Sequence, residues 1–376
     1  MQTGLKPIMD LRKKDRLEYK KKLLSLTVLL LLLMAVSLCI KTSEVGWVSP
    51  METFTNMKAW IHITLGEWFH WPISLYKFDV IDGLPNYYET VSAFKIALIT
   101  LLCGMLLSMS GCIFQGVFRN PIAAPTMLGV STGVELGILI LVLTYGTGAY
   151  TMPLEKYLYC YIGAALSLVM VIAVGKLASG KGRFSVIDLL LVGAIISQIA
   201  GAVLSYFSYA MDDETLLVYR EISSAIYVNT DPVSFYFLGG AFLISMVPMY
   251  LVRFSFNALC FDNDQSFSMG INPRIMRFAV LILGTLMITA AMVHCGAVGM
   301  ISLIVPHLSR YLFGAEFRNL FWGNLLIGGI LLVLCRDIAS MFYFGYNGNL
   351  PIGVIVSLVA APIFVIMMVN QKRGWE

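Results

Sequence analysis

The sequence predicts an all-α polytopic membrane protein with about ten transmembrane helices. Of its 376 residues, 58% are hydrophobic and only 13% are charged, whereas soluble domains are about half apolar and a quarter charged. Uncharged apolar stretches of roughly 20 residues, the length that crosses a bilayer, recur along the chain. Lys and Arg are also unevenly placed, with eight of them in residues 1–22. A basic tail beside an apolar segment is typical of a cytosolic anchor and not of a nucleic-acid-binding patch.

Hydropathy, together with the positions of Gly, Pro and charged residues, predicts ten membrane spans. The first is expected to be a retained helix because no small-residue cleavage site follows it. Two later apolar runs are too long for one helix and are divided at Cys295–Gly299 and at Gly345–Pro351, where the residue types favour turns. The ten predicted spans are 23–41, 94–118, 127–145, 157–178, 187–210, 233–254, 276–295, 298–313, 320–342 and 351–370.

The distribution of basic residues predicts the orientation of these spans. An even number of spans places the basic tail, 1–22, and the C-terminus, 371–376, on the same side of the membrane. If that side is the cytosol, nineteen of the 26 Lys and Arg residues are cytosolic and seven are not. This imbalance agrees with the positive-inside rule. We therefore expect a multi-pass protein with both termini in the cytosol.

The segment 42–93 is the one sizeable external region that this topology leaves. It holds four of the six tryptophans, which favours an amphipathic helix lying at the membrane interface. His62, Glu67 and His70 are of metal-ligand type, but an interfacial position explains them more simply. The seven cysteines are dispersed and form no Cys-x-x-Cys pair. The sequence therefore predicts neither a metal site nor a disulfide framework.

Neither of the usual energy sources for transport is evident in the chain. Gly175–Gly182 has the spacing of a phosphate-binding loop, but Gly182 replaces the Ser or Thr that would hold magnesium. Glu135 is the only carboxylate well inside a predicted span near its middle, and one carboxylate makes a poor proton relay. A transport function would therefore need a partner that supplies ATP hydrolysis.

Two glycine-rich segments are distinctive in their length and order. Gly111–Gly133 contains Asn120-Pro121, which predicts the end of one helix, and Pro125, which favours the start of the next. Gly296–Gly314 ends in Pro306-His307 and carries Arg310. Glycines at such spacing let neighbouring membrane helices approach closely.

In these segments the chain resembles the permease subunits of binding-protein-dependent ABC importers for iron-siderophore, haem and cobalamin, the FecCD-type permease family. The likeness covers residues 94 to 370, a predicted permease core of nine helices. The positions that match the family's motifs are Gly111, Gln115, Asn120, Pro121, Pro125, Gly129, Gly296, Gly299, Pro306, His307, Arg310, Asp337, Pro351 and Gly353.

The resemblance implies a fold of the cobalamin/iron-siderophore importer type in a bacterial or archaeal cell membrane. It implies a pathway between this chain and a second copy or a sister permease. It further implies two ATPase subunits on the cytosolic side and an extracytoplasmic substrate-binding protein. The chain itself would bind no cofactor, since ATP and magnesium would bind the ATPase partner. The expected cargo is a metal chelate, with an iron-siderophore or haem favoured and cobalamin as a further possibility.

The resemblance also assigns roles to two cytosolic loops. The loop 257–277 corresponds to the element that couples the permease to the ATPase, and the loop between the fourth and fifth spans corresponds to the cytoplasmic gate. The implied coupling residues are Asp262, Asp264, Ser268, Met269, Gly270 and Ile271, and the implied gate residues are Phe184, Ser185 and Val186.

The chain departs from the family where the binding protein would dock. Family members carry arginines at positions that correspond to Ala93–Ile96 and to Met341, and all are absent here. Lys95 and Arg336 are the candidate replacements, and the tryptophan-rich segment 42–93 is a further candidate surface.

Two other classes of function remain as alternatives. An ATP-independent secondary transporter or channel would work from this chain alone and would need Glu135. An integral membrane enzyme would use His294 and His307 as ligands or bases, although no partner carboxylate lies at metal-ligand spacing. The importer permease is the leading interpretation because the ordered motif set is highly specific.

Overall fold

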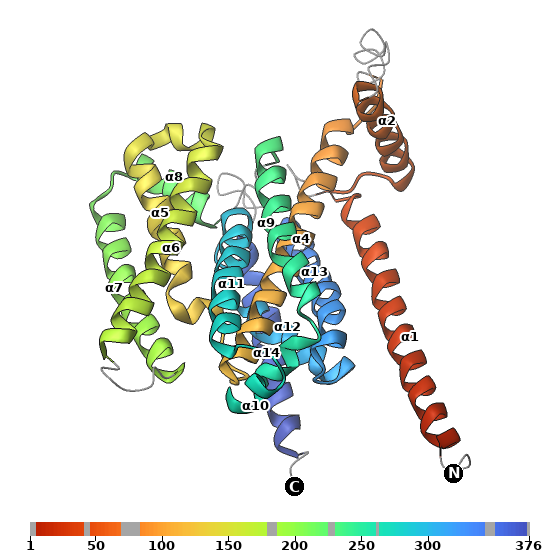
Figure 1. Ribbon diagram of the computed structural model, residues 1–376. Helices are drawn as coiled ribbons and strands as arrows, with labels where there is room; N and C mark the ends of the chain where they lie inside the picture. The colour runs from red at the N-terminus through yellow and green to blue at the C-terminus, as the bar shows by residue number, and fades with distance from the viewer. Residues whose placement is uncertain are drawn as a thin grey trace.

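The computed structural model describes residues 5–40, 46–68, 83–178, 186–224, 230–260, 263–342 and 350–373, and over these residues the chain is a bundle of α-helices without an extended strand (Figure 1). The helices are α1 (Leu5–Ser37), α2 (Pro50–Trp68), α4 (Tyr87–Phe118), α5 (Val130–Tyr145), α6 (Pro153–Ala178), α7 (Val186–Ala210), α8 (Asp213–Ser224), α9 (Pro232–Leu251), α10 (Asn263–Ser268), α11 (Pro273–Cys295), α12 (Gly299–Phe313), α13 (Phe317–Ser340) and α14 (Ile352–Arg373).

Each of the ten predicted spans overlaps one helix, namely α1, α4 to α7, α9 and α11 to α14. Within the described residues, seven segments are long and apolar enough to cross a membrane, and they belong to α4, α5, α6, α7, α9, α11 and α13. The polytopic helical fold is therefore confirmed. Of the other three helices, α12 has only 15 residues, α1 is free of charged residues only beyond Lys22, and α14 contributes the shorter apolar segment Ile352–Ile366.

The predicted boundaries differ most from the structure at the starts of three helices. Helix α1 begins at Leu5, inside the predicted basic tail, and not at 23. Helix α4 begins at Tyr87 and not at 94. Hydropathy missed these first turns because they include polar residues such as Glu89. The span expected at 127–145 begins as the short 3₁₀ helix η1 (Pro125–Leu128) and becomes α5 only after Gly129. Gly129 has a φ of 72°, which interrupts the helix and which glycine tolerates well.

Helix α4 is the centre of the bundle and packs against α13, α11 and α12. Close approach at glycines permits this arrangement. A Cβ atom added at Gly104 would lie 2.9 Å from the carbonyl carbon of Gly328, and one added at Gly133 would lie 3.0 Å from that of Gly163. Helices α4 and α13, and likewise α5 and α6, are therefore in backbone contact, as small residues allow in membrane proteins.

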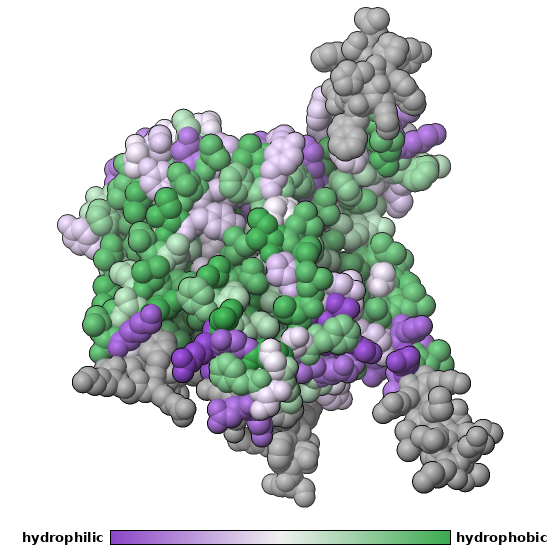
Figure 2. Space-filling view, in the orientation of Figure 1, coloured by the Kyte–Doolittle hydropathy of each residue, from purple (hydrophilic) through white to green (hydrophobic). Residues whose placement is uncertain are grey.

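The two ends of the molecule differ in what they carry. Both termini and α10 lie at one end, which we call the terminal face, whereas α2 and α8 lie at the opposite end (Figure 1). A hydrophobic band crosses the middle of the molecule, and hydrophilic side chains gather along the edge of the terminal face (Figure 2). Large apolar side chains are exposed on these helices, among them Leu191 and Ile195 on α7 and Leu243 on α9. This is the surface expected of a protein whose middle lies in lipid.

Candidate coupling face and transport pathway

The two glycine-rich motif segments pack directly against each other. Gly111 of α4 faces Ser302 of α12, and a Cβ atom added at Gly111 would lie 2.8 Å from the Ser302 Cα atom and would overlap its carbonyl group. Pro306, four residues after Ser302, lies inside α12 and has no N–H to donate to that carbonyl. The proline therefore frees a carbonyl oxygen, and the glycine allows the neighbouring backbone to approach it.

One turn further along, side chains from the same two segments form hydrogen bonds. The Gln115 Nε2 atom donates to the Leu303 carbonyl oxygen at 3.2 Å, and the Gln115 Oε1 atom accepts a hydrogen bond from Arg310 Nη2. The His307 Nδ1 atom lies 2.9 Å from the same Leu303 oxygen. Gln115, His307 and Arg310 thus form one polar network that joins α4 to α12 near the terminal face.

The turn that follows α4 is fixed by backbone hydrogen bonds. Arg119 adopts a left-handed conformation with a φ of 49° and ends the helix. The Asn120 N–H donates to the Gln115 carbonyl at 3.2 Å, and the Asn120 Oδ1 atom accepts from the Ile122 N–H at 3.0 Å. Pro125 then begins η1, as the sequence predicts. The Asn120-Pro121 motif is therefore a helix-ending device at the terminal face.

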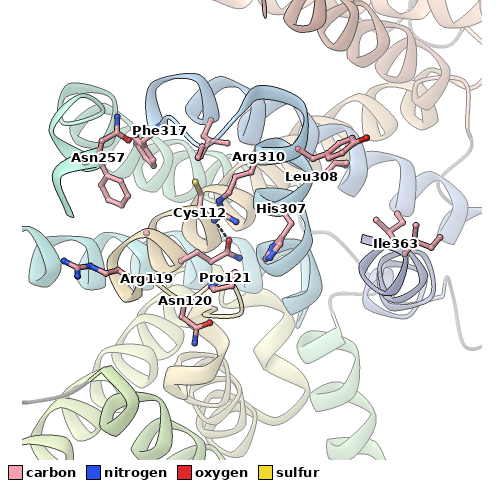
Figure 3. A pocket seen from close by; sticks show the side chains of 17 residues that line it. Cys112, Arg119, Asn120, Pro121, Asn257, His307, Leu308, Arg310, Phe317 and Ile363 are labelled. Atoms are coloured by element: carbon pink, nitrogen blue, oxygen red, sulfur yellow. Dashed lines mark hydrogen bonds between the residues drawn. The ribbon is translucent and has the colours of Figure 1, made fainter. Parts of the chain in front are cut away.

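This network lines a cavity of about 820 Å³ at the terminal-face end of the bundle (Figure 3). Its walls come from α4, α12, α13, α14 and the short helix η3 (Ser255–Cys260). Figure 3 labels Arg119, Asn120, His307 and Arg310 around it, with the bond between Arg310 and Gln115 drawn. The lining includes two arginines and a histidine but no acidic side chain from the described residues.

The predicted coupling loop contains η3, α10 and the start of α11. The buried Ser266 hydroxyl donates to the Ala258 carbonyl at 2.7 Å and so fixes α10 against η3. Gly270 turns the chain with a φ of 78°, and the Asn272 Oδ1 atom caps α11 by accepting from the Arg274 N–H at 3.1 Å. The loop is therefore a folded projection and not an unstructured connection.

The exposed side of this projection carries several of the predicted coupling residues. Asp264, Ser268, Met269 and Gly270 are exposed, and Ile271 is partly exposed. The Ile271 N–H donates to the Ser266 carbonyl at 3.1 Å. Asp262 lies outside the described residues, as do Phe184 and Ser185 of the predicted gate, and Val186 is the first residue of α7.

The remaining motif glycines, Gly296, Gly299 and Gly353, make close contacts around the break between α11 and α12. Gly296 has a φ of 69°, and an added Cβ atom would lie 2.9 Å from the backbone of Ser224 at the end of α8. At Gly353 of α14 an added Cβ atom would lie 3.0 Å from the Ala297 carbonyl oxygen. At Gly299 it would lie 3.1 Å from Thr126 Cγ2. Pro351 and Gly353 line a second cavity here.

The structure argues against a direct docking contact for Arg336. Its side chain is buried, its Nε atom lies 3.2 Å from Asp337 Oδ1, and its Nη2 atom donates to Ser37 Oγ at 2.6 Å. Arg336 is therefore less suited to docking than the sequence suggested, because this guanidinium joins α13 to α1 inside the protein. Lys95 on α4, in contrast, is partly exposed.

The histidines of the enzyme hypothesis are engaged in helix packing. His294 is buried, with its Nε2 atom 2.8 Å from the Tyr157 hydroxyl and its Nδ1 atom 2.7 Å from the Ala290 carbonyl. Among the described residues, no three His, Cys, Asp or Glu side chains are grouped so that they could hold a metal ion.

Sequence reasoning missed the polar partners Ser37 and Ser302. Ser37 is in no recognisable motif, and Ser302 lies within a motif segment but is not one of its matching positions. The one signal for Ser302 was Pro306. A proline inside a helix leaves the carbonyl four residues earlier, here that of Ser302, without its helical hydrogen-bond donor.

The fold and these interlocked motifs define a polytopic helical permease of the transporter class. The sequence matches the FecCD transport family over residues 29–370, and the chain belongs to this family.

Curated relatives of the chain differ in the cargo that their names state. A probable iron chelatin transport system permease of Helicobacter pylori is 28% identical over 73% of this chain and 80% of its own. The hemin transport system permease HmuU of Yersinia pestis is 28% identical over 73% of this chain and 81% of its own. The vitamin B12 import system permease BtuC of Citrobacter koseri is 26% identical over 93% of this chain and 94% of its own.

A solved structure has the same fold. It is described as an inward-facing conformation of a metal-chelate type ABC transporter and aligns with a TM-score of 0.71 at 22% identity. The alignment covers 93% of this chain and 99% of that one. At this identity the likeness concerns the fold, and the ten-helix permease architecture expected from the sequence is in agreement with it.

Proposed function

We propose that this protein is the transmembrane permease subunit of an ATP-driven importer that moves a metal chelate into the cell. The observation that carries the proposal is the interlocking of the two family motifs, Gly111 with Ser302 and Gln115 with Arg310, in a chain of the FecCD transport family. An iron-siderophore or haem is the favoured cargo and cobalamin is possible, in line with the names of the relatives.

In this proposal the terminal face lies in the cytosol and receives two ATPase subunits, which bind ATP and magnesium. The exposed side of α10 and the turn after it, including Asp264 and Met269, would form the contact. Because Ser266 fixes α10 to η3, this loop can transmit a movement of the ATPase to the adjoining helix α11. The gate at Phe184–Val186 would lie on the same side.

The pathway would lie between this chain and a second permease copy or a sister permease. An extracytoplasmic substrate-binding protein would deliver the chelate to the opposite face. Since Arg336 is buried, Lys95 and the exposed apolar side of α2, which includes Met51 and Phe54, are the docking surface that we propose.

Reconstitution tests the proposed function. The chain is purified from its native host with whatever copurifies, and uptake into liposomes is measured with and without ATP. We expect an ATPase and a binding protein to copurify, and uptake of the chelate that the binding protein carries to require ATP. Uptake by the chain alone without ATP would contradict the proposal and would favour a secondary transporter or channel instead.

A further inference from the structure

The second cavity, of about 640 Å³, is bounded by α5, α8, the break between α11 and α12, and the start of α14. Its lining contains one ionisable carboxylate, that of Glu135 on α5, and no Lys, Arg or His from the described part of the chain. Glu135 is partly buried. This is the carboxylate that lies well inside a predicted span and that the importer function does not otherwise use.

Backbone contacts at two of the motif glycines hold together the elements that line this cavity. Backbone contact at Gly296 brings the end of α8 to the break between α11 and α12, and contact at Gly353 brings α14 to the same break. Any side chain at Gly296 would have to displace the backbone of Ser224. The walls that face Glu135 are therefore held by backbone packing, and the cavity is a defined feature of the fold.

The three serine hydroxyls of the lining, which also includes Tyr219, donate their protons to backbone carbonyls. Ser223 Oγ donates to the Arg220 carbonyl at 3.3 Å, and Ser224 Oγ donates to the same carbonyl. Ser357 Oγ donates to the Gly353 carbonyl at 2.8 Å. Each of these hydroxyl oxygens retains only acceptor capacity. Together with the Glu135 carboxylate, the three serine oxygens give the cavity several hydrogen-bond acceptors.

A carboxylate in this position is costly for the empty protein. Removing a charged group from water without an opposite charge beside it is unfavourable, and acidic side chains within membrane helices are rare for this reason. No basic side chain of the described chain lines the cavity to offset this cost. A cation that arrives with the cargo would offset it.

We propose that this cavity is a cargo-contact chamber in which Glu135 receives the cationic, N–H-donating side of the passing chelate. The inference rests on the proposed importer function and adds a substrate class to it: chelates that carry an ammonium or amine group are favoured over those that present only carboxylate or catecholate oxygens. A single charged contact is compatible with transport, because a site with few contacts can release what it binds.

Cysteine chemistry tests the electrostatics of the chamber without knowledge of the cargo. Ser357 is exposed in the cavity wall, so Ser357→Cys introduces a thiol there. The intact importer in liposomes is treated with a trimethylammonium-bearing methanethiosulfonate or with its sulfonate-bearing analogue, and modification of residue 357 is followed by mass spectrometry. Relative to a free thiol, we expect the cationic reagent to be favoured about tenfold.

Glu135→Gln should abolish that preference, whereas Glu214→Gln, which removes an exposed carboxylate on α8 outside the cavity, should preserve it. Equal rates for the two reagents would overturn the proposal. So would a preference that persists in Glu135→Gln. A complete lack of modification would also overturn it, because a cargo chamber must open to water.

Protection by a chelate tests the contact itself. Ferrioxamine B carries a free ammonium group, and its N-acetylated form is neutral. In the Ser357→Cys variant, we expect millimolar ferrioxamine B to slow the reaction of the introduced thiol with N-ethylmaleimide more than the acetylated form does. The difference should vanish when Glu135→Gln is added. Thr144→Cys, on the exposed side of α5, should be unprotected. Equal protection, or none, would exclude the contact and would leave ATP-dependent uptake, the test of the proposed function, unaffected.

Discussion

At the scale of single residues, the contact between α4 and α12 depends on a proline and a glycine from different segments. Pro306 deprives the Ser302 carbonyl of its helical hydrogen bond, and Gly111 lets the α4 backbone come within reach of that oxygen. A Cα–H group can act as a weak donor at such a contact. The two residues are far apart in the sequence but contribute to the same contact at the Ser302 carbonyl.

Substitution of Gly111 by Ala should therefore destabilise the protein. The added methyl group would overlap the Ser302 carbonyl, so α4 and α12 would have to separate, at a cost of about 1–3 kcal/mol or more. Gly239→Ala is the matched control, since Gly239 lies inside α9 with no neighbour within 4 Å of an added Cβ atom. We expect that control to be neutral or slightly stabilising, because Ala is the better helix former.

Thermal unfolding in detergent, followed by the loss of monodisperse protein, measures both Gly111→Ala and Gly239→Ala. A lower midpoint for Gly111→Ala alone is the expected result. If both variants unfold at the midpoint of the unmodified protein, the close contact at Gly111 does not contribute to stability.

At the scale of secondary structure elements, α1 is attached to the bundle mainly along α13. Ser37 Oγ lies 3.0 Å from Asp337 Oδ1 and accepts a hydrogen bond from Arg336. At the start of the apolar part of α1, the Lys22 Nζ atom donates to the Leu312 carbonyl at 2.9 Å, and the Tyr19 ring packs edge-on against Phe313 with their centroids 5.5 Å apart. Both ends of the apolar part of α1 are therefore held by polar contacts.

Asp337→Asn should weaken this attachment strongly, because it leaves the Arg336 cation buried without its counter-charge. Breaking a buried ion pair from one side costs about 3–5 kcal/mol. The double variant Arg336→Gln with Asp337→Asn removes both charges and should be more stable than Asp337→Asn alone. Protease sensitivity of the segment after α1 and the unfolding midpoint would report the loss. Equal stability of the single and double variants would show that the pair does not carry the attachment.

At the scale of the whole molecule, hydropathy and the positions of Gly, Pro and charged residues predicted where ten helices lie, because each span must present an apolar surface to lipid. They could not predict which polar residues face inward. Arg336 was a candidate docking residue because nothing in the sequence shows that its partner Ser37, on a distant helix, lies beside it. Glu135 had a use only in the alternative of a secondary transporter or channel, because nothing in the sequence shows that α8 and α14 enclose a cavity beside it.

The elements at the molecule's outer ends were the least predictable. Helix α4 extends back to Tyr87 because its polar first turns pack against α2, where Ile63, Tyr87 and Val91 form a small core of their own. Asn56 Nδ2 adds a hydrogen bond to the Pro85 carbonyl at 2.9 Å. Such a contact offsets the unfavourable hydropathy of Glu89 and Lys95, and no span-based rule includes it.

The separation of the molecule into two working faces makes a final prediction. Charge reversal at Asp262 and Asp264 in the coupling loop should weaken association with the ATPase about tenfold and leave the binding protein's affinity unchanged. Lys95→Glu should do the reverse, because Lys95 lies toward the N-terminal end of α4, at the face opposite to α10. Each variant is thus the control for the other, and monodisperse elution checks that both are folded. Affinities of the purified permease for the two partners are measured side by side. A loss of ATPase binding in Lys95→Glu, with the binding protein unaffected, would invert the assignment of the faces, since the two partners can meet the chain only from opposite sides of the membrane.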